Sequence, residues 1–162
     1  HTVSDQAIKG GKELDVFLKT LAPKVEKNIM RAALRAGANE IRAEALSNVP
    51  VDTGDLKGSI RVTTRSKRGV VYASVKAGGK KAPHWHLVEF GTKPHRIMPR
   101  DGGGLVIGRN LVAGVDHPGA KPKPFMRPAL DTKSAEAIAA GAAKIRERLT
   151  KEGINLPGTE VE

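Results

Sequence analysis

Three histidines and one glutamate in the middle of the chain have side chains that could hold a divalent metal ion. His84, His86 and Glu89 lie close together, and His95 follows. Imidazole nitrogens and carboxylate oxygens are common ligands of such ions. The spacing opposes a shared site, because His84 and His86 face the same side only on a strand, where Glu89 points to the other side. It also differs from the helical H-E-x-x-H pattern, so we predict no metal and leave the role of the histidines open.

Two further patterns suggest phosphate binding or acid–base chemistry but fit turns better. Residues 102–104 are three glycines that follow Pro99 and Asp101, without the Gly-Lys-Ser/Thr of a phosphate-binding loop, so we interpret them as a flexible loop tip. Asp52 and Asp55 flank a Thr-Gly pair, where carboxylates commonly cap a helix. The chain has no cysteine and no nucleophile elbow. We therefore predict no enzymatic activity and no cofactor.

The positive charge is concentrated in one part of the chain. The 162 residues have a formal net charge of +11. Between Lys57 and Arg127, fifteen basic residues accompany three acidic ones, a local charge of +12, so the flanks together carry −1. We predict that seven of the basic residues face a DNA channel or a partner: Lys67, Arg68, Lys80, Lys81, Arg96, Arg100 and Arg109.

This charge suits phosphates and acidic protein surfaces equally well. Only 3% of the residues are aromatic, so few rings are available to stack on single-stranded bases. No helix-turn-helix, RRM or KH signature is present. Contact with DNA would therefore be non-specific, and a solvated basic face or an acidic protein partner remains an alternative.

Apolar residues at helical spacing predict three helices. A short one covers 12–21, a long one runs from Pro23 to about Ser47, and the last one runs from Pro128 to just before Gly153. Many residues on the apolar face of the long helix are alanines, which indicates close packing against a neighbour. Because aromatic residues are few, we expect a core of Ala, Val, Leu and Ile.

The segment between the long helices predicts strands and loops. Residues 59–64 and 70–76 form an expected antiparallel hairpin with a basic tip at 65–69. Residues 80–92 predict a basic loop and then a short helical or extended piece that ends at Gly91, with Trp85 and Phe90 packing inward. Short strands are expected at 96–98 and 105–107, within a region rich in proline and glycine.

These elements predict an α+β fold, in which a small antiparallel sheet is flanked by the long helix of the N-terminal half and by the C-terminal helix. We expect a flexible N-terminal arm at 1–10, a single domain over 11–152 with a mobile loop at about 99–119, and a short tail at 153–162. No apolar run is long enough to span a membrane, so no membrane partner is expected.

Three segments in this order resemble the small tail-component, or tail-completion, proteins of siphophages and related prophages. The first is Val49-Pro-Val-Asp-Thr-Gly-Asp-Leu-Lys-Gly-Ser-Ile60, directly after the long helix. The second is His86-Leu-Val-Glu-Phe-Gly-Thr92, and the third is Lys123-Pro-Phe-Met-Arg-Pro-Ala-Leu130, which leads into the last helix. The resemblance spans about residues 12–150. The motif residues carried over are Asp52, Thr53, Gly54, Leu56, Ser59, Ile60, Glu89, Phe90, Gly91, Thr92, Pro124, Phe125, Arg127 and Pro128.

The motif residues have the types that caps, turns and core positions require. Gly54 and Gly91 suit tight backbone conformations, and Phe90 and Phe125 suit core positions. Glu89 is predicted to pair with Arg127 across the second and third motifs.

The resemblance implies a structural virion protein without catalytic activity. It implies a ring, expected to be a hexamer, in the neck between the head-completion or connector protein and the tail terminator or tail tube, with packaged double-stranded DNA in its lumen. The location implied is the virion, and the host cytoplasm during assembly. A free-standing non-specific DNA-binding protein and a metal-dependent hydrolase are the alternative functions.

Overall fold

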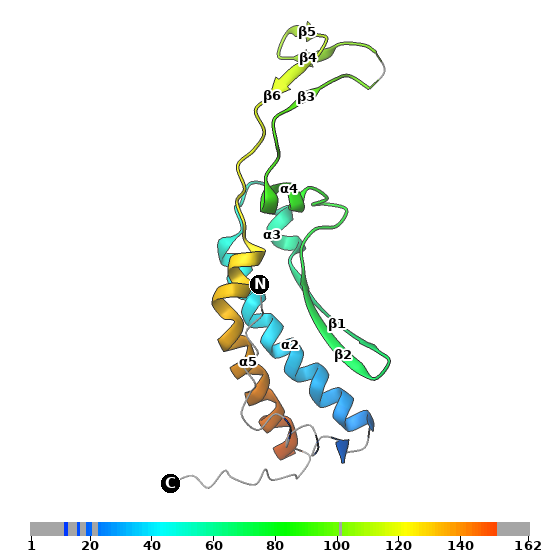
Figure 1. Cartoon of the computed structure of the whole chain (residues 1–162), viewed down its shortest axis with the longest axis vertical. Helices are drawn as coiled ribbons and strands as arrows, with labels where there is room; N and C mark the ends of the chain where they lie inside the picture. The colour runs from blue at the N-terminus through cyan, green and yellow to red at the C-terminus, as the bar shows by residue number, and fades with distance from the viewer. Residues whose placement is uncertain (1–11, 13–15, 17–18, 21–22, 101, 152–162) are drawn as a thin grey trace. The chain divides into compact units, whose positions relative to one another are not determined.

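The computed structural model describes residues 12, 16, 19–20, 23–100 and 102–151 (Figure 1). Contacts within the chain divide it into two compact units. The helical unit comprises His1–Glu40, Val62–Val75 and Ser134–Glu162, and the arm unit comprises Ile41–Arg61 and Lys76–Lys133. The predicted terminal segments 1–10 and 153–162, and most of the predicted helix over 12–21, lie outside the described residues.

The described residues form an α+β fold, as predicted. The helices are α2 (Pro23–Asn48), α3 (Asp55–Ser59), α4 (Trp85–Phe90) and α5 (Met126–Lys151). The strands are β1 (Arg61–Lys67), β2 (Val70–Lys76), β3 (His95–Ile97), β4 (Leu105–Ile107), β5 (Asn110–Val112) and β6 (Val115–His117). They pair as two-stranded sheets in the orders β1–β2, β3–β6 and β4–β5. No helix of the described residues is long and apolar enough to cross a membrane.

In the helical unit, small residues bring α2 and α5 close together. A Cβ atom at Gly37 would lie 2.6 Å from the carbonyl oxygen of Ala137, and one at Gly141 would lie 3.4 Å from the carbonyl oxygen of Ala33. Ala33 is buried, as are Ile29 on α2 and Leu149 on α5. The close packing expected from the alanine-rich face of α2 is therefore confirmed.

Strand β2 of the β1–β2 ribbon alternates in burial, as its sequence pattern predicts. Val71, Ala73 and Val75 are half-buried, whereas the residues between them are exposed. Thr64 on the half-buried side accepts a hydrogen bond from the guanidinium of Arg35 on α2 (3.3 Å). The strands extend further toward the tip than expected, because the connection is a two-residue turn in which Arg68 and Gly69 both have positive φ, 51° and 80°.

In the arm unit, the core lies where the end of α2, α3 and the start of α5 contribute small and aliphatic residues. Ala45, Val49, Leu56, Ile60 and Ala129 are buried there. Phe125 and Ala82 are completely buried as well. The expected aliphatic core is confirmed, with Phe125 as its aromatic member among the described residues.

The segment 99–119 contains more regular structure than a flexible loop. β3 and β4 lie within one residue of the two expected short strands, but β5 and β6 were not predicted. β6 returns to pair with β3, with His95 opposite His117 and Ile97 opposite Val115. The sequence carries little local signal for this pairing, because each strand has three residues and the partners are far apart in the chain.

Candidate functional site

Residues 92–122, which carry β3 to β6, form an arm that leaves the rest of its unit after α4 and returns to α5 (Figure 1). The second motif lies at the outgoing end of this arm and the third at the returning end. We call these two ends, residues 87–92 and 119–127, the root of the arm. The root is where motif residues from distant parts of the sequence meet.

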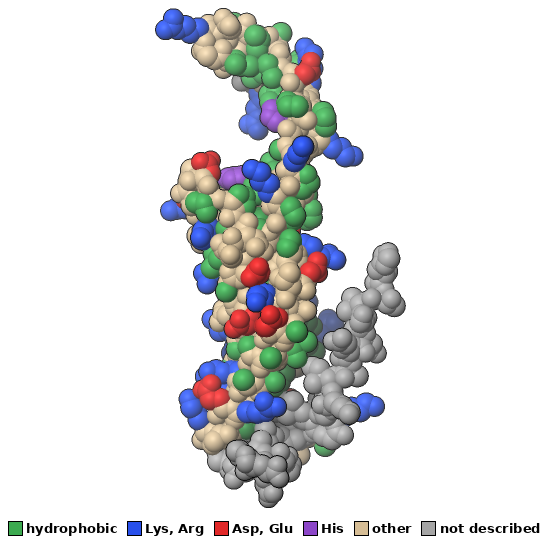
Figure 2. Space-filling view, turned by 90° about the vertical axis from the view of Figure 1, so that its left-hand side faces the viewer, with side chains coloured by type: hydrophobic (Ala, Val, Ile, Leu, Met, Phe, Trp, Pro, Cys, Tyr) green, Lys and Arg blue, Asp and Glu red, His purple; other side chains and the backbone are tan. Residues whose placement is uncertain are grey.

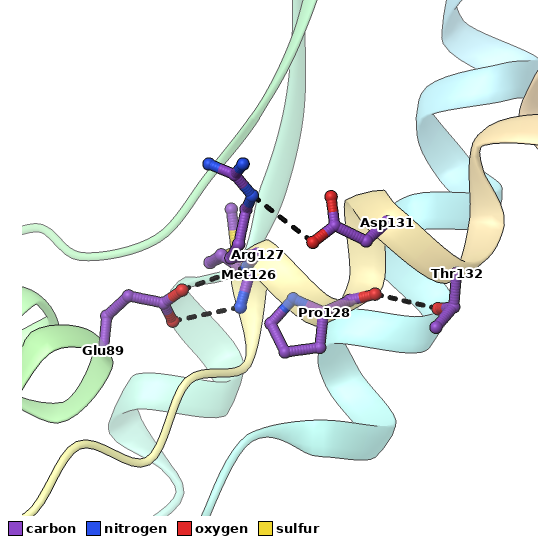
Figure 3. Close-up of polar contacts among 6 residues, drawn as sticks. All are labelled: Glu89, Met126, Arg127, Pro128, Asp131 and Thr132. Atoms are coloured by element: carbon purple, nitrogen blue, oxygen red, sulfur yellow. Dashed lines mark hydrogen bonds and ion pairs between the residues drawn. The ribbon is translucent and has the colours of Figure 1, made fainter. Parts of the chain in front are cut away.

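Glu89 connects the two ends of the root. Its carboxylate is buried, with 4% of the residue exposed, and accepts a hydrogen bond from the backbone N–H of Phe125 (2.8 Å). It also accepts hydrogen bonds from the backbone N–H groups of Met126 (3.0 Å) and Arg127 (3.0 Å) (Figure 3). The first N–H groups of a helix have no partner inside the helix. Pro128, the next residue of α5, has no N–H. Glu89 therefore satisfies the free donors of the first turn of α5 and places a negative charge at the positive end of the helix dipole.

The predicted ion pair between the side chains of Glu89 and Arg127 is wrong, although the carboxylate of Glu89 does contact Arg127 through its backbone. Glu89 binds the backbone of Arg127, and the Arg127 guanidinium instead lies 3.3 Å from the carboxylate of Asp131, one turn along α5 (Figure 3). The Arg127 side chain is largely exposed, so its charge stays in water. A buried carboxylate facing a helix N-terminus is stabilised by the backbone donors without a cation.

The two ends of the root approach each other very closely at Gly91. Its φ is 71°, and a Cβ atom there would lie 2.5 Å from the carbonyl oxygen of Ala120. Thr92 and Ala120 exchange backbone hydrogen bonds of 2.9 and 3.1 Å, and the Thr92 hydroxyl accepts another from the Ala120 N–H (2.9 Å). The N–H of Lys123 donates to the carbonyl of Val88 (2.8 Å). Gly91 and Thr92 therefore clamp the root through contacts that a larger residue at 91 would block.

The two phenylalanines of the motifs have opposite environments. Phe125 is completely buried, as expected, but Phe90 is 71% exposed and does not pack inward. Glu89 turns toward the start of α5, and the neighbouring Phe90 consequently points away from it, as does the half-exposed Leu87 three residues earlier. Trp85 is intermediate in burial and lies against Gly78.

The first motif folds as a turn that leads into α3. Gly54 is the N-cap with φ 86° and has no side-chain cap, while the Thr53 hydroxyl accepts from the Asp55 N–H (3.4 Å). Asp52, which was expected to help cap this turn, is exposed and makes no hydrogen bond recorded among the described residues.

The rest of the first motif anchors the turn on its unit. Leu56 and Ile60 are buried, and the Ser59 hydroxyl accepts from the N–H of Gly78 (2.8 Å). These three residues occupy fold-defining positions.

The seven basic residues predicted to face DNA or a partner are all exposed, and they are divided between the two units. Lys67 and Arg68 belong to the helical unit, where they end the β1–β2 ribbon. The other five, Lys80, Lys81, Arg96, Arg100 and Arg109, belong to the arm unit. Arg96 lies 3.4 Å from the carboxylate of Asp116 on the opposite strand, so its charge is already paired.

The histidines of the candidate metal pattern, for which no metal was predicted, do not converge. His84 and His86 are exposed on either side of the first residue of α4, whereas His95 lies in the arm, where its ring faces that of His117 with centroids 5.1 Å apart. Within the described ranges, no three or more His, Cys, Asp or Glu side chains form a group able to hold a metal ion. His117 was missed by the sequence analysis, since only the register of β3 and β6 brings it opposite His95.

The comparisons with known proteins give one match. The family model described as "Bacteriophage HK97-gp10, putative tail-component" matches residues 12–91. This range contains the whole first motif and all but the last residue of the second. No curated protein and no solved structure gives a significant match. Through residues 12–91 the chain is therefore similar to the HK97-gp10-like family of bacteriophage tail components, a similarity that indicates a structural virion protein.

Proposed function

We propose that this protein is a neck, or tail-completion, protein that assembles into a ring, with six copies as the expected number, and joins the phage tail to the head connector around the DNA channel. The observation that carries this proposal is the family match over 12–91, which contains the motif that places Glu89 at the start of α5. The third motif lies beyond the match, yet it is held to the second by that carboxylate.

The distribution of charge supports a channel role. Basic side chains are exposed at the tip of the β1–β2 ribbon and along the arm, and the arm itself carries few carboxylates. In a ring, several copies would bring such surfaces together around a polyanion, which offsets their mutual repulsion. The same repulsion disfavours a ring in isolation, so we expect the purified chain to be a monomer or a weak oligomer.

The mass of the purified full chain at low and at high salt tests this expectation. A monomer or weak oligomer at low salt, and a ring only when the head-completion or tail-terminator protein of the same phage is added, would agree with the proposal. A stable ring at low salt without any partner would contradict the explanation of the charge.

Non-specific DNA binding by the free protein is the second candidate, favoured by the exposed cations of the ribbon tip, Lys67 and Arg68. It predicts retention of duplex DNA in a gel shift, with an affinity that falls steeply as salt rises. The absence of retention at moderate salt would eliminate this candidate. Elemental analysis of the purified protein for divalent metals would address the hydrolase alternative in the same way.

A further inference from the structure

Apolar side chains lie exposed on the arm. Val106 and Leu111 are directly opposite each other on β4 and β5 and are 74% and 71% exposed. Met98 and Ile107 are also exposed. Figure 2 shows hydrophobic and basic side chains together on the surface of the arm. Exposed aliphatic side chains gathered on one small element are typical of a surface that binds a partner.

None of the described residues of the arm is buried, so the arm offers no core in which to bury these side chains. Its sheets each have two strands of three residues, and isolated strand pairs of this kind are only marginally stable. Leu111 lies over Gly104 and Met98 lies over Gly114, where a Cβ atom would meet each side chain. The glycines thus let both apolar side chains lie flat along the ribbon, which leaves a broad apolar surface rather than a core.

The charges beside this surface indicate the chemistry of the partner. Arg109 lies in the turn between β4 and β5, and Arg100 comes shortly after the end of β3. Both are exposed, and neither has an ion pair with a described residue. From Lys93 to Lys121 the sequence contains five basic and two acidic residues, so the arm repels another copy of itself and attracts carboxylates or phosphates.

The apolar surface distinguishes between these two kinds of anion. DNA phosphates would pair with Arg100 and Arg109 but would leave the opposed aliphatic side chains of Val106 and Leu111 without a counterpart. No Phe, Trp or Tyr lies between Gly91 and Pro124 to stack on bases. A protein surface with an apolar patch bordered by carboxylates satisfies both features of the arm.

We propose that the arm docks on an acidic surface of a partner protein. Val106 and Leu111 cover an apolar patch there, and Arg100 and Arg109 contact carboxylates around it. The clamped root, through Glu89 and the Thr92–Ala120 bridge, holds the two ends of the arm together before binding and so reduces the ordering that binding requires. The choice of partner to test rests on the proposed neck function, whereas the chemistry of the surface rests on the arm.

The test places a photo-crosslinking residue, p-benzoylphenylalanine, at position 106 of the full chain. The probes are the purified tail-terminator protein and the purified head-completion protein of the same phage, with a short DNA duplex as a third. We expect a crosslink to one of the two proteins in a peptide rich in Asp and Glu. The double variant Arg100→Glu/Arg109→Glu should weaken that binding at least about tenfold, and Val106→Ser/Leu111→Ser by about tenfold.

Matched variants elsewhere on the chain should leave the binding unchanged. Lys24→Glu/Lys27→Glu reverses the same amount of charge at exposed positions of α2, and Ile138→Ser removes a half-exposed apolar side chain from α5. Circular dichroism of every variant verifies that it is folded.

Three results would overturn the inference: no binding to either protein, binding that the arm variants do not weaken, or arm-dependent binding to the duplex or to a second copy alone. Mass measurement of the same mixtures separates this inference from the proposed function. A ring that forms normally with the arm variants would agree with the neck role and contradict the docking proposed for the arm. Arm-dependent binding without any ring would agree with the docking and contradict the neck role.

Discussion

At the scale of single residues, the most consequential side chain is Glu89, a buried carboxylate whose partners are three backbone N–H groups. It caps a helix that begins more than thirty residues later in the chain, and no side-chain cation is needed for it to do so. Glu89 was predicted to pair with the side chain of Arg127, but its backbone partners were not predicted, because the residue type does not show where a backbone N–H will lie. Pro128 was the available hint, since a proline in the first turn marks a helix start.

We expect Glu89→Gln to destabilise the protein by about 2 kcal/mol, because it removes the charge and turns an amide NH₂ toward backbone donors. Urea unfolding followed by circular dichroism measures the change. Asp131→Asn is the matched control, because it removes a carboxylate from an exposed ion pair of the same helix and should cost at most about 1 kcal/mol. Equal losses for the two variants would contradict the role given to Glu89.

The two motif phenylalanines should respond oppositely to truncation. Phe125→Ala removes a completely buried ring and should cost about 3 to 5 kcal/mol. Phe90→Ser removes an exposed ring and should change the unfolding free energy by less than about 0.5 kcal/mol. Thermal melts of both variants measure the two changes in stability. A large loss of stability in Phe90→Ser would mean that the Phe90 ring is packed against the protein.

Glu147 gives a pH dependence of known sign. Side-chain hydrogen bonds from Lys144 (2.7 Å) and then Lys151 (3.1 Å) lower the pKa of its carboxyl below the ordinary value. Such a group contributes stability above its unfolded pKa and loses that contribution as the pH falls through its folded pKa. An NMR titration should show this lowered pKa, and Lys144→Gln should raise it. An unchanged pKa in the variant would contradict the cause.

At the scale of elements, the long helices and the β1–β2 ribbon could be predicted, because each has a local pattern. Apolar spacing placed α2 within one residue of its ends and α5 within two residues of its start, and alternation identified β2. The pairing of β3 with β6 depends on a long-range register. The exposed side of α4 depends on the direction in which the Glu89 side chain points. Those features follow from tertiary contacts, so the strands β5 and β6 and the exposure of Phe90 were missed.

The close contact of α2 and α5 makes a glycine prediction at this scale. Gly37→Ala should lower stability by about 1 to 3 kcal/mol, because its Cβ would lie 2.6 Å from the backbone oxygen of Ala137 and the helices must separate. Gly58→Ala in α3 has nothing within 4 Å of its Cβ and should be neutral or stabilising by up to about 1 kcal/mol. Chemical unfolding of the two variants measures both changes in the free energy of unfolding. If Gly37→Ala is as stable as the parent, the close packing is refuted.

At the scale of the whole molecule, the charge of +11 is divided between two units that carry it differently. In the helical unit, Lys67 and Arg68 place exposed positive charge at the tip of the β1–β2 ribbon, which suits a surface facing phosphates. In the arm unit Arg100 and Arg109 accompany exposed aliphatic side chains, which suits a protein surface. The proposed neck role would require both kinds of contact, with DNA in the channel and with the neighbouring proteins.

The most direct test of the neck assignment is electron cryomicroscopy of the intact particle, focused on the junction of head and tail. The proposed neck role predicts a ring of copies of this chain between the head connector and the tail, with the arm of each copy against a neighbouring protein. A neck that contains no density for this chain, or density for the chain only elsewhere in the tail, would contradict the proposed neck role.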